Sequence, residues 1–136
     1  MYPPELVAPM KKELVDAGFK EMITAGDVDA GMKNDGTTLV VVNSVCGCAA
    51  GAARPGVRMA LKNGKLPVHL TTVFAGVDKD AVEQARKYML PYPPSSPSIA
   101  LFKNGKLVHF LERHHIEGRS AEMIAENLKA AFDEFC

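Results

Sequence analysis

The stretch Thr38-Leu-Val-Val-Val-Asn-Ser-Val-Cys46-Gly-Cys48-Ala-Ala-Gly-Ala-Ala53 decides the fold of this chain. Leu39 to Val42 is an unbroken apolar run rich in β-branched residues, which is typical of a strand covered on both faces. We therefore place this strand at the centre of a sheet. A helix is expected to follow from about Cys48, so the two cysteines lie where a buried strand passes into a helix.

A thiol at the start of a helix lies beside free backbone N–H groups and the positive end of the helix dipole. Both lower its pKa toward neutrality, so that the reactive thiolate is populated at cellular pH. Cys46 is therefore the predicted nucleophile, and Gly47 would let the backbone approach closely. Cys48 lies inside the first turn, from where it can attack a mixed disulfide formed at Cys46. It is the predicted resolving cysteine.

The single residue between the two cysteines limits the disulfide that they can form. So small a ring meets disulfide geometry poorly, and the strain should make the bond easy to reduce. This favours an exchange or isomerisation catalyst, or a reductase of mixed disulfides, over a strong general reductant. Two other interpretations stay open, namely a pair of unreactive buried thiols and a metal site. The metal site would need further ligands from Cys136, His69, His109, His114 or His115.

Periodicity and capping residues predict the elements that precede the central strand. A helix over about 4–17 would bury one side, formed by Leu6, Met10, Leu14 and Val15. Residues 19–23 are expected to form a short strand, and Asp27 to cap a helix that ends near Lys33.

Strands and helices alternate in the rest of the chain. We expect a helix over about 48–62 that bends near Pro55, a strand over 68–74, and a helix capped by Asp78 or Asp80. The apolar side of that helix would be Val82, Ala85 and Met89.

A hairpin and a last helix complete the predicted fold. Strands over 99–103 and 107–112 flank Asn104-Gly105, a strong hairpin signal because a type I′ turn needs positive φ at both positions. Ser120 is expected to cap the last helix, whose inner face is Ala121, Ile124, Leu128, Ala131 and Phe135. The element order predicts an α/β thioredoxin-like fold, in which a central mixed sheet is flanked by helices and preceded by a helical extension.

The composition limits the classes of partner. With 136 residues, of which 47% are hydrophobic, the chain is expected to form a single domain over 1–136. Sixteen basic and sixteen acidic residues cancel, so we expect neither nucleic acid nor a membrane as a partner. The N-terminal residues carry no signal-peptide pattern, which predicts a cytoplasmic protein, and an odd number of cysteines argues against a structural disulfide framework.

Pro97 stands directly before the predicted strand from Ile99. A proline at this position, followed by an apolar run and a Lys-Asn-Gly hairpin, looks like the cis-proline strand of the thioredoxin superfamily. That resemblance implies that Pro97 follows a cis peptide bond and lies against the dithiol. The alternative is a proline-rich loop without a special role.

Three motifs together resemble the bacilliredoxin family: Asn43-Ser-Val-Cys-Gly-Cys-Ala-Ala-Gly-Ala-Ala-Arg-Pro55, Pro94-Ser-Ser-Pro-Ser98 and Arg113-His-His-Ile-Glu-Gly-Arg-Ser120. The resemblance implies a small cytosolic enzyme that removes bacillithiol from client proteins carrying it as a mixed disulfide, with Cys46 attacking. It also implies a low-molecular-weight thiol as co-substrate, with no other cofactor and no metal. Disulfide isomerase activity is attributed to the family as well.

The segment from Arg113 to Gly118 should flank the dithiol, because the strand before it ends on the same edge of the sheet. Arg113, with His114 or His115, could bind the carboxylates of bacillithiol through charge-assisted hydrogen bonds. Ser96, beside Pro97, is a further predicted substrate-binding residue. The alternative for this segment is a solvated polar turn.

The strand before the dithiol lacks the buried acid that thioredoxins usually carry, so the resolving step has no obvious base. Besides the bacilliredoxin function, a disulfide isomerase or redox sensor stays open. A non-enzymatic metal-binding module using Cys46, Cys48 and a histidine is a third alternative. Cys136 is expected to be a surface thiol at the end of the chain.

Overall fold

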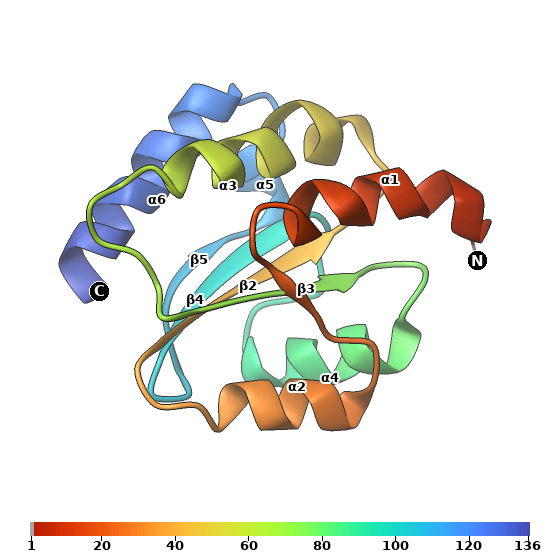
Figure 1. Ribbon diagram of the computed structural model, residues 1–136, viewed down its shortest axis with the longest axis horizontal. Coiled ribbons are helices and arrows are strands. Elements are labelled where there is room, and N and C mark those ends of the chain that lie inside the picture. Colours follow the sequence, from red (N-terminus) through yellow and green to blue (C-terminus); the bar gives the residue numbers. More distant parts are fainter. Residues whose placement is uncertain (1) are drawn as a thin grey trace.

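A computed structural model describes residues 2–136 and has a five-stranded mixed sheet in the order β1-β3-β2-β4-β5 (Figure 1). The strands are β1 (Lys20–Glu21), β2 (Thr37–Asn43), β3 (His69–Phe74), β4 (Ser98–Lys103) and β5 (Lys106–Leu111). The first three run parallel to one another, whereas β4 pairs antiparallel with both β2 and β5. The predicted α/β class and mixed sheet are confirmed.

Strand β2 lies at the centre of the sheet, as the apolar run predicts, and each of its seven residues is buried. Leu39 and Val41 belong to the core on one face of the sheet, and Val40 and Val42 to the core on the other. This alternation buries both faces, which explains why the strand is continuously apolar rather than amphipathic. The end of β2 is thereby held rigidly where the cysteines follow.

Helices cover both faces of this sheet (Figure 1). On one face lie α1 (Pro4–Val15), α3 (Arg54–Ala60), the short α5 (Arg113–Ile116) and α6 (Ala121–Phe135). On the other lie α2 (Ala25–Met32) and α4 (Lys79–Tyr88). Helix α5 was not predicted. Within residues 2–136 there is no helix with the length and apolarity that a membrane crossing requires.

The predicted buried side of the first helix is partly wrong. Val7 and Leu14 are the buried residues of α1, whereas Leu6 is 44% exposed and Val15 41% exposed. Successive helical residues are about 100° apart, so Leu6 and Val15 lie to either side of the stripe that Val7 and Leu14 define.

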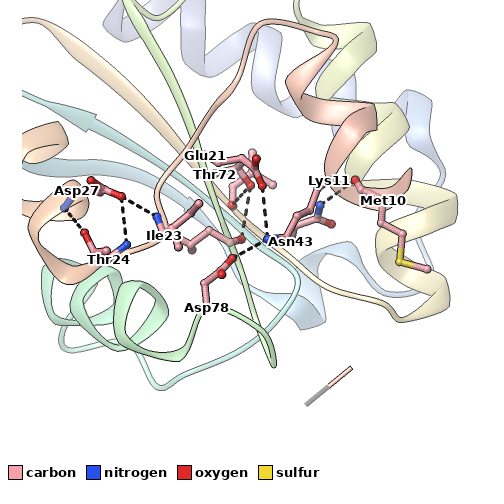
Figure 2. A network of polar contacts seen from close by, with 11 residues as sticks. Met10, Lys11, Glu21, Ile23, Thr24, Asp27, Asn43, Thr72 and Asp78 are labelled. Carbon is pink, nitrogen blue, oxygen red and sulfur yellow. Dashed lines mark hydrogen bonds and ion pairs between the residues drawn. The ribbon is translucent and has the colours of Figure 1, made fainter. Parts of the chain in front are cut away.

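The caps of α2 and α4 also differ from the prediction. The Thr24 hydroxyl caps α2 by accepting from the Asp27 N–H at 3.0 Å, and the Asp27 carboxylate accepts from the N–H of Ile23 and of Thr24 (Figure 2). These backbone hydrogen bonds lower the pKa of Asp27. Asp78 precedes α4 without capping it, because its carboxylate is paired with Lys11 Nζ at 3.1 Å (Figure 2).

The helix after the cysteines is not one continuous α-helix. A π-helical segment, η1 (Ala49–Ala53), precedes α3, and the Arg54 N–H donates to the Ala49 carbonyl five residues back. Pro55 lies in the first turn of α3, which follows η1 without a break, so a backbone donor is missing where the two helical segments join. The predicted irregularity therefore lies before Pro55 and takes the form of a wide turn.

The C-terminal elements agree with the sequence. Asn104 and Gly105 have φ of 51° and 80°, as the predicted turn requires, and Ser120 caps α6 by accepting from the Met123 N–H at 3.2 Å. Helix α6 buries Ile124, Ala125, Leu128, Ala131 and Phe132 against the sheet and α3.

Gly56→Ala should destabilise the fold by about 1–3 kcal/mol. A Cβ at Gly56 would lie 2.7 Å from Ile124 Cβ and 3.0 Å from the Ala121 carbonyl oxygen, so α3 and α6 would have to separate. Gly51→Ala is the matched control, because a Cβ there meets no atom within 4 Å. Urea unfolding of both variants measures the difference. Equal stability of the two would contradict the close α3–α6 contact.

Candidate dithiol site

Two free thiols follow the end of β2 in a tight arrangement. Cys46 Sγ and Cys48 Sγ lie 3.3 Å apart, and both side chains are half-buried. The Ser44 hydroxyl lies 3.2 Å from Cys46 Sγ and accepts a hydrogen bond from the Cys46 N–H at 3.2 Å. Because that N–H fills the acceptor side of the hydroxyl, the Ser44 proton is free to point at the sulfur.

Cys46 is the more acidic of the two thiols. Burial by itself would raise the pKa of Cys46, but the hydrogen bonds to its sulfur outweigh burial and lower it below the ordinary value. The Ser44 hydroxyl and the Cys48 thiol lie 3.2 Å and 3.3 Å from the sulfur, and the nearby backbone N–H groups of Ala49 and Cys48 act in the same direction. All of them favour the thiolate over the thiol.

Cys48 is shifted in the opposite direction. Burial, the hydrogen bond to Cys46 and the negative charge of the Cys46 thiolate raise the pKa of Cys48, while the positive charge of Arg113 opposes them. The first proton to leave the pair is therefore that of Cys46, and the proton that remains is on Cys48, which lies within hydrogen-bonding distance of the Cys46 sulfur. The two thiols thus differ in acidity, and the roles of Cys46 as nucleophile and Cys48 as resolving cysteine stay predictions.

Gly47 between them is exposed, and a Cβ there would meet no atom within 4 Å. The packing of residues 2–136 therefore does not require glycine at this position, and the expected close approach of the backbone at Gly47 stays a prediction.

A pocket of about 340 Å³ opens beside Cys46. Its lining comes from Ser44 to Cys46, from Ala75 and Gly76, and from Tyr2, Arg86, Ser96 and Arg113. The last two are predicted substrate-binding residues, and Arg86 of α4 was missed. The pocket thus joins segments that are far apart in the sequence. Apart from Cys46 and Tyr2, its ionisable residues are Arg86 and Arg113.

Pro97 is buried, and the Ser96–Pro97 peptide bond is cis, as the resemblance implies. The next residue, Ser98, is opposite Val42 in the pairing of β4 with β2. Pro97 therefore lies at the edge of the sheet where β2 leads into the dithiol. The Leu90–Pro91 bond is also cis, which was not predicted.

Arg113 begins α5 and is joined to the loop before Pro97. The Arg113 side chain donates from Nη1 to the Ser96 carbonyl oxygen at 3.1 Å and pairs through Nε with Glu117 at 2.9 Å. The backbone N–H of Arg113 donates to the Ser95 hydroxyl at 3.3 Å. The bond to Glu117 and the negative charge that the dithiol carries when it is ionised raise the pKa of Arg113. The predicted placement of Arg113 beside the dithiol therefore agrees with the structure.

The two histidines lie differently. His114 is 70% exposed, and His115 Nδ1 accepts from the Glu112 N–H at 3.0 Å. Neither lines the Cys46 pocket, and His115 faces a separate pocket of about 330 Å³ between β5 and α6. Among residues 2–136 the one group spaced to hold a metal ion is Glu112, His114 and His115, which includes neither cysteine.

Arg54, like Arg86 and Ser44, is a residue near the site that sequence reasoning missed. Its guanidinium is 2% exposed, pairs with Glu13 at 2.7 Å, and donates to Asn43 Oδ1 at 2.9 Å and to the Ser44 carbonyl oxygen at 2.8 Å. A lone cation within the small-residue run Ala49 to Gly56 was the available signal. Within residues 2–136 no carboxylate forms a hydrogen bond with either thiol.

Ser44→Ala should slow alkylation of Cys46 by iodoacetamide several-fold at pH 7. Losing the hydroxyl removes a hydrogen bond that stabilises the thiolate, so the pKa of Cys46 rises and a smaller thiolate fraction remains. The pH profile of the alkylation rate should shift to higher pH. Ser95→Ala is the control, because the Ser95 hydroxyl accepts from the backbone N–H of Arg113 and is not among the hydrogen-bond partners of Cys46 Sγ. An unshifted profile for Ser44→Ala would rule out this hydrogen bond as a cause.

The fold has clear counterparts among solved structures. A thioredoxin from Schistosoma mansoni superposes with a TM-score of 0.57 at 17% identity, over 85% of this chain and 96% of that one. A mutant thioredoxin from Halobacterium salinarum superposes with a TM-score of 0.60 at 12% identity, over 88% of this chain and 91% of that one. These neighbours confirm the thioredoxin fold.

Sequence comparison gives the family. The family model described as "Disulphide isomerase" matches residues 2–136. A bacilliredoxin from Cytophaga hutchinsonii is 68% identical over 98% of this chain and 99% of its own. One from Geobacillus kaustophilus is 54% identical over 99% of this chain and 94% of its own. With two adjacent free thiols on a thioredoxin fold and relatives this close over nearly the whole chain, the protein belongs to the bacilliredoxin family and is a thiol-disulfide oxidoreductase.

Proposed function

We propose that this enzyme removes bacillithiol from cytoplasmic client proteins that carry it as a mixed disulfide. One observation carries the proposal, namely the opposite pKa shifts of two thiols 3.3 Å apart beside an arginine-lined pocket. The names of the relatives support bacillithiol as the small thiol. It would be a co-substrate, and no metal or other cofactor takes part in the proposed reaction.

The first step is attack by the Cys46 thiolate on the sulfur of bacillithiol in the mixed disulfide. The bond between that sulfur and the client sulfur breaks, and the client leaves as a thiolate. A new disulfide joins Cys46 to bacillithiol. The client gains the electron pair, so it is reduced while Cys46 is oxidised.

The second step releases the small thiol. Cys48 as a thiolate attacks Cys46 Sγ, bacillithiol leaves as a thiolate, and a Cys46–Cys48 disulfide remains. Two further thiols must then reduce that disulfide. Alternatively a second bacillithiol attacks the mixed disulfide directly and leaves as the bacillithiol disulfide.

Formation of the mixed disulfide itself activates Cys48. Burial contributes most to the raised pKa of Cys48, followed by the hydrogen bond to the Cys46 thiolate and its negative charge. The last two disappear once Cys46 is bonded to bacillithiol, and only burial still raises the pKa of Cys48. The Cys48 thiol thus becomes more acidic after the mixed disulfide has formed, which is when it has to attack. The client thiolate that leaves in the first step can take the Cys48 proton.

Arg113 is the proposed contact for the carboxylates of bacillithiol, with Ser96 beside it in the pocket. His114 and His115 remain predicted contacts that would have to approach the thiol from outside this pocket.

The test is a turnover assay on one client protein, modified either with bacillithiol or with glutathione. With the wild-type enzyme and an excess of the matching free thiol, we expect the client thiol to be released at least tenfold faster from the bacillithiol adduct than from the glutathione adduct. Equal rates would contradict bacillithiol as the preferred substrate while leaving the oxidoreductase assignment intact.

Disulfide isomerisation is the second candidate, favoured by the description of the matching family model. Reactivation of scrambled ribonuclease without any small thiol separates the two functions. An isomerase would restore ribonuclease activity without a small thiol, whereas an enzyme that only removes bacillithiol would not.

A further inference from the structure

Arg86 is a half-buried cation that forms no ion pair with any of residues 2–136. Its Nε is shielded from solvent and has no hydrogen-bond partner among these residues. Burial lowers the pKa of Arg86, although an arginine stays charged at neutral pH. An N–H donor that is shielded from water and has no partner is unfavourable, so an anion that accepts a hydrogen bond from Arg86 Nε would be bound with a net gain.

Arg86 reaches the pocket from the opposite side of the sheet to Arg113. It belongs to α4, whereas Arg113 begins α5, and both line the pocket that contains Cys46. Arg113 already binds Glu117 and the Ser96 carbonyl, which leaves Arg86 as the less neutralised of the two. No carboxylate lines this pocket among residues 2–136, so its field favours anions.

A guanidinium group with free N–H donors matches a carboxylate best, because two parallel hydrogen bonds can form. We infer that Arg86 binds a carboxylate of the small thiol that is disulfide-bonded to Cys46, and so selects acidic thiols over neutral ones. This inference rests on the proposed function, because it assumes that a small thiol occupies the pocket.

The first test needs no bacillithiol. Iodoacetate and iodoacetamide alkylate the same thiolate, but only iodoacetate is an anion that a cationic pocket attracts. In a Cys136→Ser background, Arg86→Gln should lower the rate ratio of iodoacetate to iodoacetamide at Cys46 roughly three- to tenfold. The iodoacetamide rate should stay within about twofold of the parent, and peptide mass spectrometry would follow Cys46 alone.

Lys87→Gln is the matched control, because it makes the same charge change at the neighbouring exposed position of α4 and lines no part of the pocket. It should leave the ratio unchanged. A ratio that is the same in Arg86→Gln and Lys87→Gln would overturn the inference. High salt should reduce the difference between Arg86→Gln and the parent.

The second test compares two mixed disulfides of one client, with bacillithiol and with the neutral thiol 2-mercaptoethanol. Arg86→Gln should reduce kcat/KM for the bacillithiol adduct roughly tenfold and leave the 2-mercaptoethanol adduct within about twofold. Equal losses on both adducts would overturn the inference, because they would place Arg86 in contact with the client. A wild-type enzyme without any preference for bacillithiol would instead contradict the proposed function, and the alkylation ratio would still report on Arg86.

Discussion

Cys46→Ser should lose all turnover of mixed disulfides, because a serine hydroxyl does not ionise near neutral pH and cannot replace the thiolate. The hydrogen bonds that lower the pKa of Cys46 make this thiol the attacking group of the pair. The measurement is release of the client thiol from a bacillithiol adduct. Circular dichroism and thermal unfolding would check that the variant is folded.

Cys48→Ser should behave differently from Cys46→Ser. Attack by Cys46 still occurs, but the intramolecular resolving group is absent, so the Cys46–bacillithiol disulfide accumulates when free thiol is scarce. Intact mass spectrometry would detect one bound bacillithiol per chain. Excess bacillithiol should restore turnover if a second thiol can resolve the adduct.

Cys136→Ser is the control for both variants, because this exposed thiol follows α6 and lies outside the Cys46 pocket. It should retain wild-type turnover. Measurable turnover by Cys46→Ser, or accumulation of the adduct on Cys48 in place of Cys46, would reverse the assigned roles.

Glu13→Gln should destabilise the protein by about 3 kcal/mol, the lower end of the cost of breaking a buried ion pair. The Arg54 guanidinium is 2% exposed and Glu13 is the carboxylate that pairs with it, at 2.7 Å. Removing the carboxylate charge leaves Arg54 buried without a counter-charge. Since Glu13 itself is 38% exposed, solvent screening keeps the expected loss below the upper end.

Arg54→Met should cost less than Glu13→Gln, about 1–3 kcal/mol. It removes the buried charge together with its hydrogen bonds, and the main penalty is the Ser44 carbonyl left without its partner. The double variant should be no less stable than Glu13→Gln alone, since it leaves no unpaired charge. Guanidinium unfolding of the two single variants and the double variant gives the coupling energy.

Asp16→Asn is the matched control for this cycle. It breaks the Lys12–Asp16 pair on the same helix, whose side chains are 72% and 53% exposed, and should change stability by less than about 0.5 kcal/mol. If Glu13→Gln were equally mild, the ion pair with Arg54 would not stabilise the end of β2.

Much of the fold could be predicted because its signals are local. The apolar run at Leu39 to Val42, the Asn104-Gly105 turn and the Ser120 cap each act over a few residues. The exposed Leu6 and Val15 were not predicted correctly, because the rotation of α1 depends on what packs beneath it. Likewise Asp78 failed as a cap because Lys11, 67 residues away, binds its carboxylate.

The sequence by itself determined that two thiols follow a buried strand and that Cys46 precedes Cys48 at the start of the helix. It also determined that a proline, Pro97, precedes β4. Only the tertiary structure decided how the pocket is charged. Arg86 and Arg113 reach Cys46 from α4 and α5, while His114 and His115 lie outside the pocket. The physical reason is range: helix, strand and turn preferences act between near neighbours, whereas the electrostatics of a site depend on charges that long-range packing brings together or leaves unpaired.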